Sequence, residues 1–171
     1  MENPKVFILD VDGVLTTGHF LYSCEGKFLK VFGPDDNDAL SLLSPSIEVR
    51  FVTGDSKGFS ISSRRIVEDM NYSLDLVSTF RRHEWISERY DPTEVIYMGD
   101  GIFDHYVMMH VGYSIAPANA DKNAKAYASY VTERSGGDRA VAEACLHILG
   151  KFFAPYDPWV MNANKSEISG E

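Results

Sequence analysis

The sequence predicts an α/β fold, a doubly wound parallel sheet with a small β-hairpin after the first strand and no cap domain. The first observation is the apolar run Val6–Leu9, which leads directly into Asp10 and Asp12. A continuous apolar run is typical of a strand buried on both faces, as in parallel sheets covered by helices. The second is that β-prone runs then alternate with helical segments along the chain. A chain of 171 residues is also long enough to bury one substantial core.

The composition excludes several classes of partner. Sixteen basic and 25 acidic residues give a net charge of −9, and no block of Lys and Arg is present, so binding to nucleic acid or anionic membranes is not expected. No apolar stretch reaches the length of a transmembrane helix. Cys24 and Cys145 lack metal-ligand spacing and are expected to be free thiols. These features predict a cytoplasmic protein whose substrate is a small molecule.

The first half of the chain reads as a strand, a hairpin and two strand–helix units. The hairpin spans about residues 19–32, because two β-prone runs flank a link containing Gly26. After Gly33-Pro34, Asp35 or Asp36 is expected to cap a helix that runs through Leu43. The expected elements that follow are a strand at 47–52, a helix at 56–70 and a strand at 73–78.

The second half continues the alternation. A helix containing Trp85 and Ile86 ends before Asp91-Pro92, because the residue before a proline disfavours helical geometry. The expected elements are then a strand at 94–98, a helix at 102–110, a strand at 112–116, a helix at 122–127, a strand at 129–131 and a helix at about 138–153. We predict a single domain over residues 1–154 and a flexible tail over residues 155–171, which is rich in polar residues.

Polar residues follow three of the predicted strands at the point where each strand ends. Asp10 and Asp12 follow the first strand, Thr53 follows the second, and Asp100 with Asp104 follows the fourth. Because the carboxyl ends of parallel strands meet at one edge of a sheet, these side chains are expected to converge there. The same edge is where open α/β sheets bind their ligands, so it is the predicted site.

The chemistry of these residues points to metal-dependent phosphoryl transfer. Mg²⁺ prefers oxygen ligands, which Asp10 and Asp100 can provide, and Asp104 can orient the metal or its waters. Asp10 can attack phosphorus as a nucleophile, and Asp12 can protonate the leaving oxygen and later activate water. Thr53 and nearby backbone N–H groups can hold the phosphoryl oxygens while charge develops on them.

The motif from Asp10 to Gly18, the pair Thr53-Gly54 and the spacing of Asp100 and Asp104 resemble the haloacid dehalogenase superfamily over roughly residues 5–153. The short hairpin and Gly136-Gly137 resemble one branch, the capless phosphatases of 3-deoxy-D-manno-octulosonate 8-phosphate and related sugar acid phosphates. The resemblance implies a Rossmann-like core, Mg²⁺-dependent hydrolysis of a phosphate monoester, such as a sugar phosphate, through an aspartyl-phosphate, and a homotetramer.

The resemblance also assigns the site. It places the metal on Asp10, Asp100, Asp104 and the backbone carbonyl of Asp12. Gly13, Thr53, Gly54 and Asp55 are expected to contact the phosphate or the rest of the substrate, with Asp10, Asp12 and Thr53 acting in catalysis.

The charge pattern departs from that branch at three positions. Asp35, Asp55 and Asp138 occupy places where the family usually carries arginine. In the family these arginines contribute to holding anionic sugar acids or to the subunit contacts around the site. Three such reversals would repel a carboxylate if they face the ligand. The sequence therefore predicts a phosphate ester with a neutral or amino-bearing leaving group.

A further departure concerns the lysine that the branch carries near the nucleophile. The corresponding region contains His83 and Glu84 at the simplest register, and Arg82 or Arg81 lies just before them. We predict that Arg82 supplies the missing positive charge.

Two other classes were weighed against a phosphatase. A receiver domain would carry a lysine after its fifth strand, and none follows residues 113–116. A catalytically impaired module with an oligomerisation or regulatory role is favoured by the lost lysine and arginines. The intact Asp10, Asp12, Thr53 and Asp100 argue against that alternative.

Overall fold

The computed structural model describes residue 1 and residues 3–160, and it contains the predicted doubly wound sheet. Six parallel strands are ordered β5-β4-β1-β6-β7-β8, and β2 and β3 form a separate antiparallel hairpin. The strands are β1 (Val6–Asp10), β2 (Thr16–Ser23), β3 (Gly26–Phe32), β4 (Glu48–Thr53), β5 (Ser73–Leu76), β6 (Val95–Met98), β7 (Tyr113–Ala116) and β8 (Tyr130–Val131). Because the first strand lies in the middle of this order, its carboxyl end is surrounded by loops from both halves of the chain.

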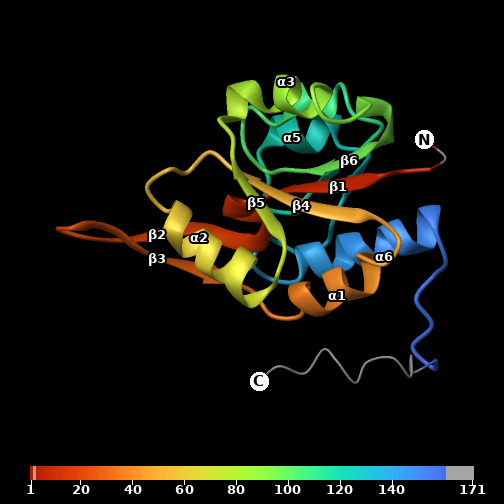
Figure 1. Ribbon diagram of the computed structural model, residues 1–171, viewed down its shortest axis with the longest axis horizontal. Coiled ribbons are helices and arrows are strands. Elements are labelled where there is room, and N and C mark those ends of the chain that lie inside the picture. The colour runs from red at the N-terminus through yellow and green to blue at the C-terminus, as the bar shows by residue number, and fades with distance from the viewer. Residues whose placement is uncertain (2, 161–171) are drawn as a thin grey trace.

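Helices cover both faces of the sheet (Figure 1). The helical elements are η1 (Val11–Leu15), α1 (Asp36–Leu43), α2 (Phe59–Ser63), η2 (Arg64–Asp69), η3 (Thr79–Arg81), α3 (Arg82–Ser87), η4 (Pro92–Glu94), α4 (His105–Met108), α5 (Lys122–Tyr127) and α6 (Ala140–Phe152). None of them, within the described part of the chain, combines the length and apolar character needed to cross a membrane.

Strand β1 shows why the fold needs both helical layers. Phe7 and Leu9 pack into the cluster that contains α1 and α6, whereas Val6 and Ile8 pack into the cluster that contains α3, α4 and α5. Successive side chains of a strand point to opposite faces, so an uninterrupted apolar run must be covered on both. All four side chains are completely buried, which confirms the fold class predicted from this run.

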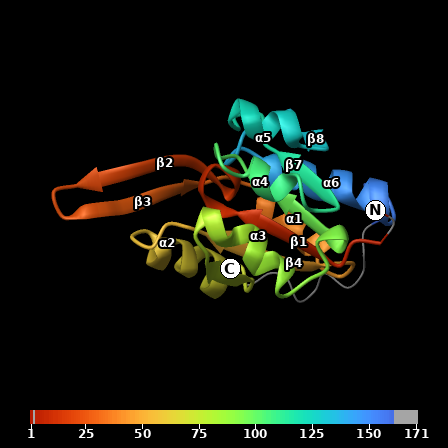
Figure 2. The same cartoon turned by 90° about the horizontal axis from the view of Figure 1, so that it is seen from above.

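The hairpin projects beyond the carboxyl end of β1 and away from the body of the molecule (Figure 2). It is longer than expected, because the strands run from Thr16 to Phe32 and only Cys24 and Glu25 form the turn. Its register shifts between Thr16 and Phe20 and again between Leu21 and Tyr22. These irregularities twist and bend the ribbon as it leaves the sheet.

Several predicted helix ends were wrong by a few residues, each for a local reason. The helix expected at 102–110 is confined to α4, because residues 99–104 form a turn in which the Asp104 carboxylate accepts from the Gly101 N–H. Helix α6 begins at Ala140 rather than at Asp138, because Gly137 and Arg139 have positive φ angles of 67° and 71°. A left-handed residue cannot belong to a right-handed helix.

The expected cap of α1 was also wrong. Asp35 precedes the helix but has a positive φ of 65° and makes no capping hydrogen bond; its carboxylate pairs with Arg139. Asp36 instead accepts a hydrogen bond of 2.9 Å from the N–H of Ala142 in α6. The acids at the start of α1 therefore fasten this helix to α6.

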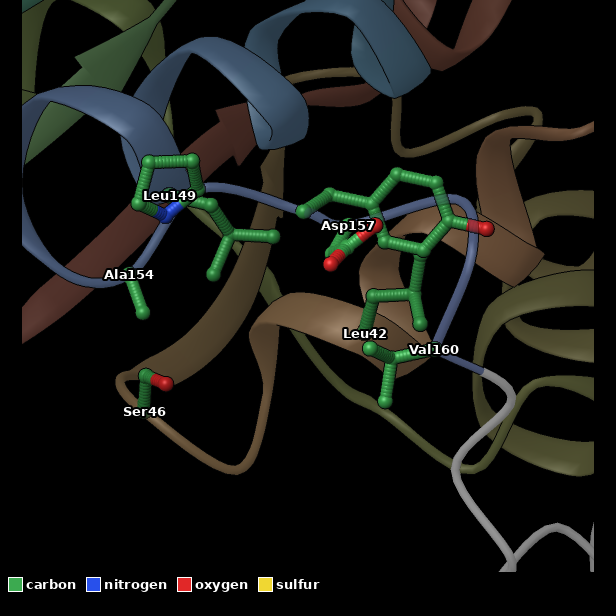
Figure 3. Close-up of a pocket in the computed structure, with 8 residues that line it drawn as sticks. Leu42, Ser46, Leu149, Ala154, Asp157 and Val160 are labelled. Carbon is green, nitrogen blue, oxygen red and sulfur yellow. The ribbon is translucent and has the colours of Figure 1, made fainter.

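The end of the described chain follows α6. Residues 154–160 are all exposed, and residues 161–171 of the predicted tail lie outside the described residues. A pocket of about 320 Å³ here is lined by residues that include Leu42, Leu149, Asp157 and Val160 (Figure 3). The sheet spans Val6 to Val131, and one domain over residues 1–154 remains a prediction.

Candidate active site

The carboxyl edge of the sheet brings the predicted residues together. Strand β1 pairs in parallel with β4, with Asp10 opposite Val52, so Thr53 lies beside the acids of the first loop. It also pairs with β6, with Leu9 opposite Met98, so Gly99 and Asp100 leave the sheet beside Asp10. A pocket of about 420 Å³ opens here, lined by Asp10, Asp12, Phe20, Lys27, Gly54, Asp55, Ser78, Thr79, Phe80, Arg82 and Phe103. It shares no lining residue with the pocket in Figure 3.

Arg82 occupies the centre of the site. Its guanidinium donates 2.7 Å and 3.0 Å hydrogen bonds to the two carboxylate oxygens of Asp10. The same nitrogen that binds Oδ2 of Asp10 also lies 3.1 Å from Oδ1 of Asp104. The arginine side chain is 2% exposed. A planar guanidinium can bind both oxygens of one carboxylate and still reach a second acid, which an ammonium cannot do with the same geometry.

Tyr97 completes this buried network. Its hydroxyl donates to Oδ1 of Asp104 over 2.6 Å and accepts from Arg82 over 2.8 Å. Both oxygens of Asp104 are therefore engaged, because Oδ2 accepts from Gly101 N–H. Burial alone would lower the pKa of Arg82, but the Asp10 carboxylate and its other buried partners raise that pKa well above its ordinary value. The arginine stays charged and balances the acids around it.

The acids are crowded enough to fit a divalent cation. Asp10, Asp100 and Asp104 each present a carboxylate oxygen, and these atoms lie within 4.8 Å of one another. Burial, followed by the charges of Asp10 and Asp104, raises the pKa of Asp100 to about 8. Burial also raises the pKa of Asp10 to about 6, against the opposing effect of Arg82. An all-oxygen donor set with excess negative charge is suited to a hard cation such as Mg²⁺.

Two glycine positions make room for this cluster. Gly13 has a φ of 86°, and a Cβ there would lie 1.9 Å from Oδ2 of Asp100. Gly136 approaches the same turn, and a Cβ there would lie 1.8 Å from the carbonyl oxygen of Gly13. The loop before α6 therefore packs directly against the turn that carries Asp12, and only glycine permits both approaches.

Asp12 is held by Thr53 at the end of β4 and by Lys30 of the hairpin strand β3. The Thr53 hydroxyl lies 3.3 Å from Oδ2 of Asp12 and accepts from the N–H of Asp55 over 3.1 Å. Lys30, whose side chain is completely buried, donates to Asp12 over 3.0 Å and to Ser62 over 2.9 Å. The hydroxyl of Thr53 thus orients Asp12.

Asp55 faces the pocket but does not carry a free charge. Lys27 and Lys30 lie 2.5 Å and 2.9 Å from its Oδ2. Although burial alone would raise the pKa of Asp55, hydrogen bonds from these two lysines lower it to about 2. The other two departures, Asp35 and Asp138, do not line this pocket, and both lie against Arg139.

Sequence reasoning missed the residues that complete the site. Tyr97 lies in an apolar buried strand two residues before Gly99, and a lone hydroxyl there is a signal that could have identified it. Lys27 and Lys30 gave no such signal, because residues three apart in a regular strand face opposite sides. Phe20, from the hairpin, also lines the pocket.

A parallel sheet whose first strand ends in Asp10, beside an acidic cluster that can fit a metal ion, is typical of one class of protein: phosphotransfer enzymes with their aspartates at the sheet edge. The model of the haloacid dehalogenase-like hydrolases matches residues 86–144. The chain is 34% identical over 154 residues to the 3-deoxy-D-manno-octulosonate 8-phosphate phosphatase KdsC of Salmonella typhi, covering 84% of this chain and 78% of that protein. The Yersinia pestis KdsC is 31% identical over 157 residues, covering 86% and 80%.

Solved structures agree with these relatives. The phosphatase of this name from Moraxella catarrhalis, in complex with a magnesium ion, a phosphate ion and a KDO molecule, has a TM-score of 0.73 and 25% identity, covering 87% of each chain. The cobalt-bound enzyme from Haemophilus influenzae has a TM-score of 0.74 and 28% identity, covering 87% of this chain and 89% of that one. The chain belongs to the haloacid dehalogenase superfamily, in the branch of capless phosphatases that includes KdsC.

The Arg82 network yields a prediction for stability. Arg82→Met would leave Asp10 and Asp104 buried without their cation, so we expect the free energy of unfolding to fall by about 3–5 kcal/mol. Arg81→Ala is the matched control, because Arg81 is 71% exposed and its ion pair, with Glu84, lies at the surface. Urea unfolding of the metal-free proteins measures both. An equal loss in the two variants would contradict the role assigned to Arg82.

The acidic cluster predicts two effects of Asp100→Asn: the metal-free protein becomes more stable, and its stabilisation by Mg²⁺ is lost. The pKa of Asp100 is raised from 3.8 to about 8, so between these values the folded state binds a proton that the unfolded state has lost. Stability from this group therefore falls as the pH rises through that window. Asp100→Asn should raise the melting temperature of the metal-free protein at pH 8, by about 5 °C, and this gain should shrink toward pH 4.

Mg²⁺ is expected to stabilise the wild-type protein, since a ligand bound only by the folded state raises its stability, and the same variant should lose this effect. Thermal scans in EDTA and in millimolar Mg²⁺ measure both effects. Destabilisation of the metal-free protein by Asp100→Asn, or an unchanged response to Mg²⁺, would argue against a metal site at Asp100.

Proposed function

We propose that the protein hydrolyses small phosphate monoesters of the sugar phosphate class in a Mg²⁺-dependent reaction with Asp10 as the nucleophile. The observation that carries this proposal is the setting of Asp10. Its carboxylate lines the pocket, with a side chain 12% exposed, while Arg82 and the N–H of Val11 fix both of its oxygens. A carboxylate oriented in this way can attack without first reorganising.

The proposed reaction proceeds in two steps. A carboxylate oxygen of Asp10 forms a bond to phosphorus, the bond from phosphorus to the ester oxygen breaks, and Asp12 gives that oxygen its proton. Asp12 then takes a proton from water, the water oxygen attacks the aspartyl-phosphate, and inorganic phosphate leaves as the carboxylate of Asp10 is restored. Thr53 and Lys30 hold Asp12 in place for both proton transfers.

The metal site is part of the proposal. Asp10, Asp100 and the backbone carbonyl of Asp12 would hold Mg²⁺, which neutralises the charge that otherwise keeps a dianionic phosphate from the acids. Asp104 is 1% exposed and binds Arg82 and Tyr97, so this acid is placed to orient Arg82 and metal-bound water. Gly13 and Gly54 allow close approach to the phosphate, and Gly54 lines the pocket.

A catalytically impaired module was the alternative, and it drew support from the missing family lysine. Arg82 contacts the nucleophile directly and supplies a cation at that place. This contact favours the enzyme over the module.

The leaving group is proposed to be uncharged. The relatives named KdsC are phosphatases of a sugar acid phosphate, but Asp55 lines the pocket here where the family usually carries arginine. Since Lys27 and Lys30 already neutralise Asp55, its carboxylate attracts an amino group less than a free acid would. The expectation of a neutral or amino-bearing leaving group is thereby narrowed to a neutral one.

Oligomerisation and location complete the proposal. The hairpin exposes Leu21, Tyr22, Phe28, Leu29 and Val31, each at 40% or more. Apolar exposure on this scale favours contact with further copies of the chain, in line with the predicted homotetramer. A cytoplasmic location remains the prediction from composition.

Replacing the nucleophile tests the reaction. Asp10→Asn should reduce Mg²⁺-dependent hydrolysis of p-nitrophenyl phosphate by about a thousandfold or more, because the amide cannot form the aspartyl-phosphate. Asp38→Asn is the matched control, because Asp38 lies in α1 and does not line the pocket. Steady-state assays with and without EDTA measure the effect. Activity retained by Asp10→Asn, or insensitive to EDTA, would refute the mechanism.

A panel of sugar phosphates tests the leaving group. We expect kcat/KM for neutral sugar phosphates to exceed that for 3-deoxy-D-manno-octulosonate 8-phosphate by about tenfold. The carboxylate of the octulosonate would lie near Asp55, where no unpaired cationic side chain is available to bind it. Asp55→Asn releases Lys27 and should narrow this difference. A preference of the wild-type enzyme for the octulosonate phosphate would contradict the proposal of an uncharged leaving group.

A further inference from the structure

Three phenylalanines line the pocket beside the acids, and the proposed reaction assigns no role to them. Phe20 comes from the hairpin, Phe80 from η3 and Phe103 from the loop after β6. Their exposed fractions are 40%, 74% and 38%. Large apolar side chains exposed together at the mouth of a site mark a surface that contacts something apolar. We call these three residues the aromatic rim.

Two members of the rim are tied to the phosphate end of the pocket. The ring centroids of Phe80 and Phe103 lie 4.7 Å apart with an interplanar angle of 48°, a favourable tilted pair. Phe80 lies two residues before Arg82, and Phe103 immediately precedes Asp104. Because Arg82 and Asp104 are buried and paired with each other, the backbone that carries both rings is anchored to the site.

The third ring is held by the hairpin lysine. The Nζ atom of Lys27 lies 3.4 Å from the centroid of the Phe20 ring, a cation–π contact, and the same amine binds Asp55. Asp55, Lys27 and Phe20 therefore form one connected unit. Beyond the phosphate end, the charged groups of the pocket are paired with each other, and the rings provide its apolar surface.

We propose that the aromatic rim binds the leaving group, and that the preferred substrates are phosphate monoesters whose uncharged leaving group presents an aromatic or similarly flat apolar face. This inference rests on the proposed phosphatase function. Within the sugar phosphate class it favours sugars whose ring presents its apolar C–H face, and it extends the class to esters with an aromatic leaving group. An apolar face stacked on the rim buries area that both partners otherwise expose to water. A sugar acid would instead place its carboxylate beside rings and paired charges.

The test compares two substrates with similar chemistry at the ester bond. 2-Phenylethyl phosphate and glycerol 3-phosphate are both esters of primary alcohols, so a difference in kcat/KM reports binding of the leaving group rather than its reactivity. We expect the wild-type enzyme with Mg²⁺ to prefer 2-phenylethyl phosphate by about tenfold or more. Phe80→Ala should raise KM for this substrate by about three- to tenfold and change that for glycerol 3-phosphate by less than about twofold.

Two control variants distinguish loss of the aromatic ring at position 80 from a nonspecific effect of removing an exposed aromatic side chain. Phe80→Tyr keeps the ring and should retain the preference. Tyr127→Ala removes an aromatic side chain that is 52% exposed but does not line the pocket, and it should leave both KM values unchanged. Size-exclusion chromatography with light scattering follows the oligomeric state of each variant.

Each contrary outcome has a distinct meaning. Equal or better turnover of glycerol 3-phosphate by the wild-type enzyme, while both esters are hydrolysed, overturns the proposed substrate class and leaves the phosphatase intact. An equal loss on both substrates in Phe80→Ala, together with a changed oligomeric state, assigns the rim to a contact between copies and also overturns it. Failure to hydrolyse any ester, including p-nitrophenyl phosphate, would refute the phosphatase function itself.

Discussion

The site depends on one buried ion-pair network, in which Arg82 binds both oxygens of Asp10 and reaches Asp104. The network joins the end of β1 to α3 and to the loop after β6, with Tyr97 as its fourth member. A charge buried without a partner is very costly, so these segments are fixed relative to one another. The same contacts orient the carboxylate that we propose as the nucleophile. The guanidinium of Arg82 therefore both stabilises the fold and orients the proposed nucleophile.

Charge balance explains the rest of the site. Five carboxylates meet there, Asp10, Asp12, Asp55, Asp100 and Asp104, and three cationic side chains oppose them, Lys27, Lys30 and Arg82. The excess of two negative charges is what a divalent cation would balance. Burial is the main cause of the raised pKa values of Asp10 and Asp100, and the neighbouring carboxylates add to it. The hairpin supplies two of the three cations, so it is an electrostatic part of the site as well as a projection from the fold.

The residues that resemble the superfamily and the residues that depart from the branch lie in different parts of the structure. In the proposed reaction the acids, Thr53 and the glycine turns hold the phosphate, and the chemistry of phosphoryl transfer constrains them. Asp55 and the aromatic rim are proposed to face the leaving group, where a change of charge or shape would alter which ester fits. Asp35 and Asp138 lie against Arg139 and outside this pocket, so of the three charge reversals only Asp55 bears on the ligand within one chain.

The sequence by itself determined the fold class, the order of most elements and the edge of the sheet where the acids converge. These follow from local patterns: an apolar run that needs two covered faces, and parallel strands whose carboxyl ends meet. The prediction of Arg82 came from the resemblance, because the branch carries a lysine near the nucleophile and the segment just before His83 offers an arginine. Only the tertiary structure decided how the charges pair. The contacts of Lys27 and Lys30 with Asp55, and of Tyr97 with Asp104, join residues whose convergence depends on hairpin register and strand packing. Such contacts leave no periodic signal in the sequence, because they form between segments that meet only in the folded chain.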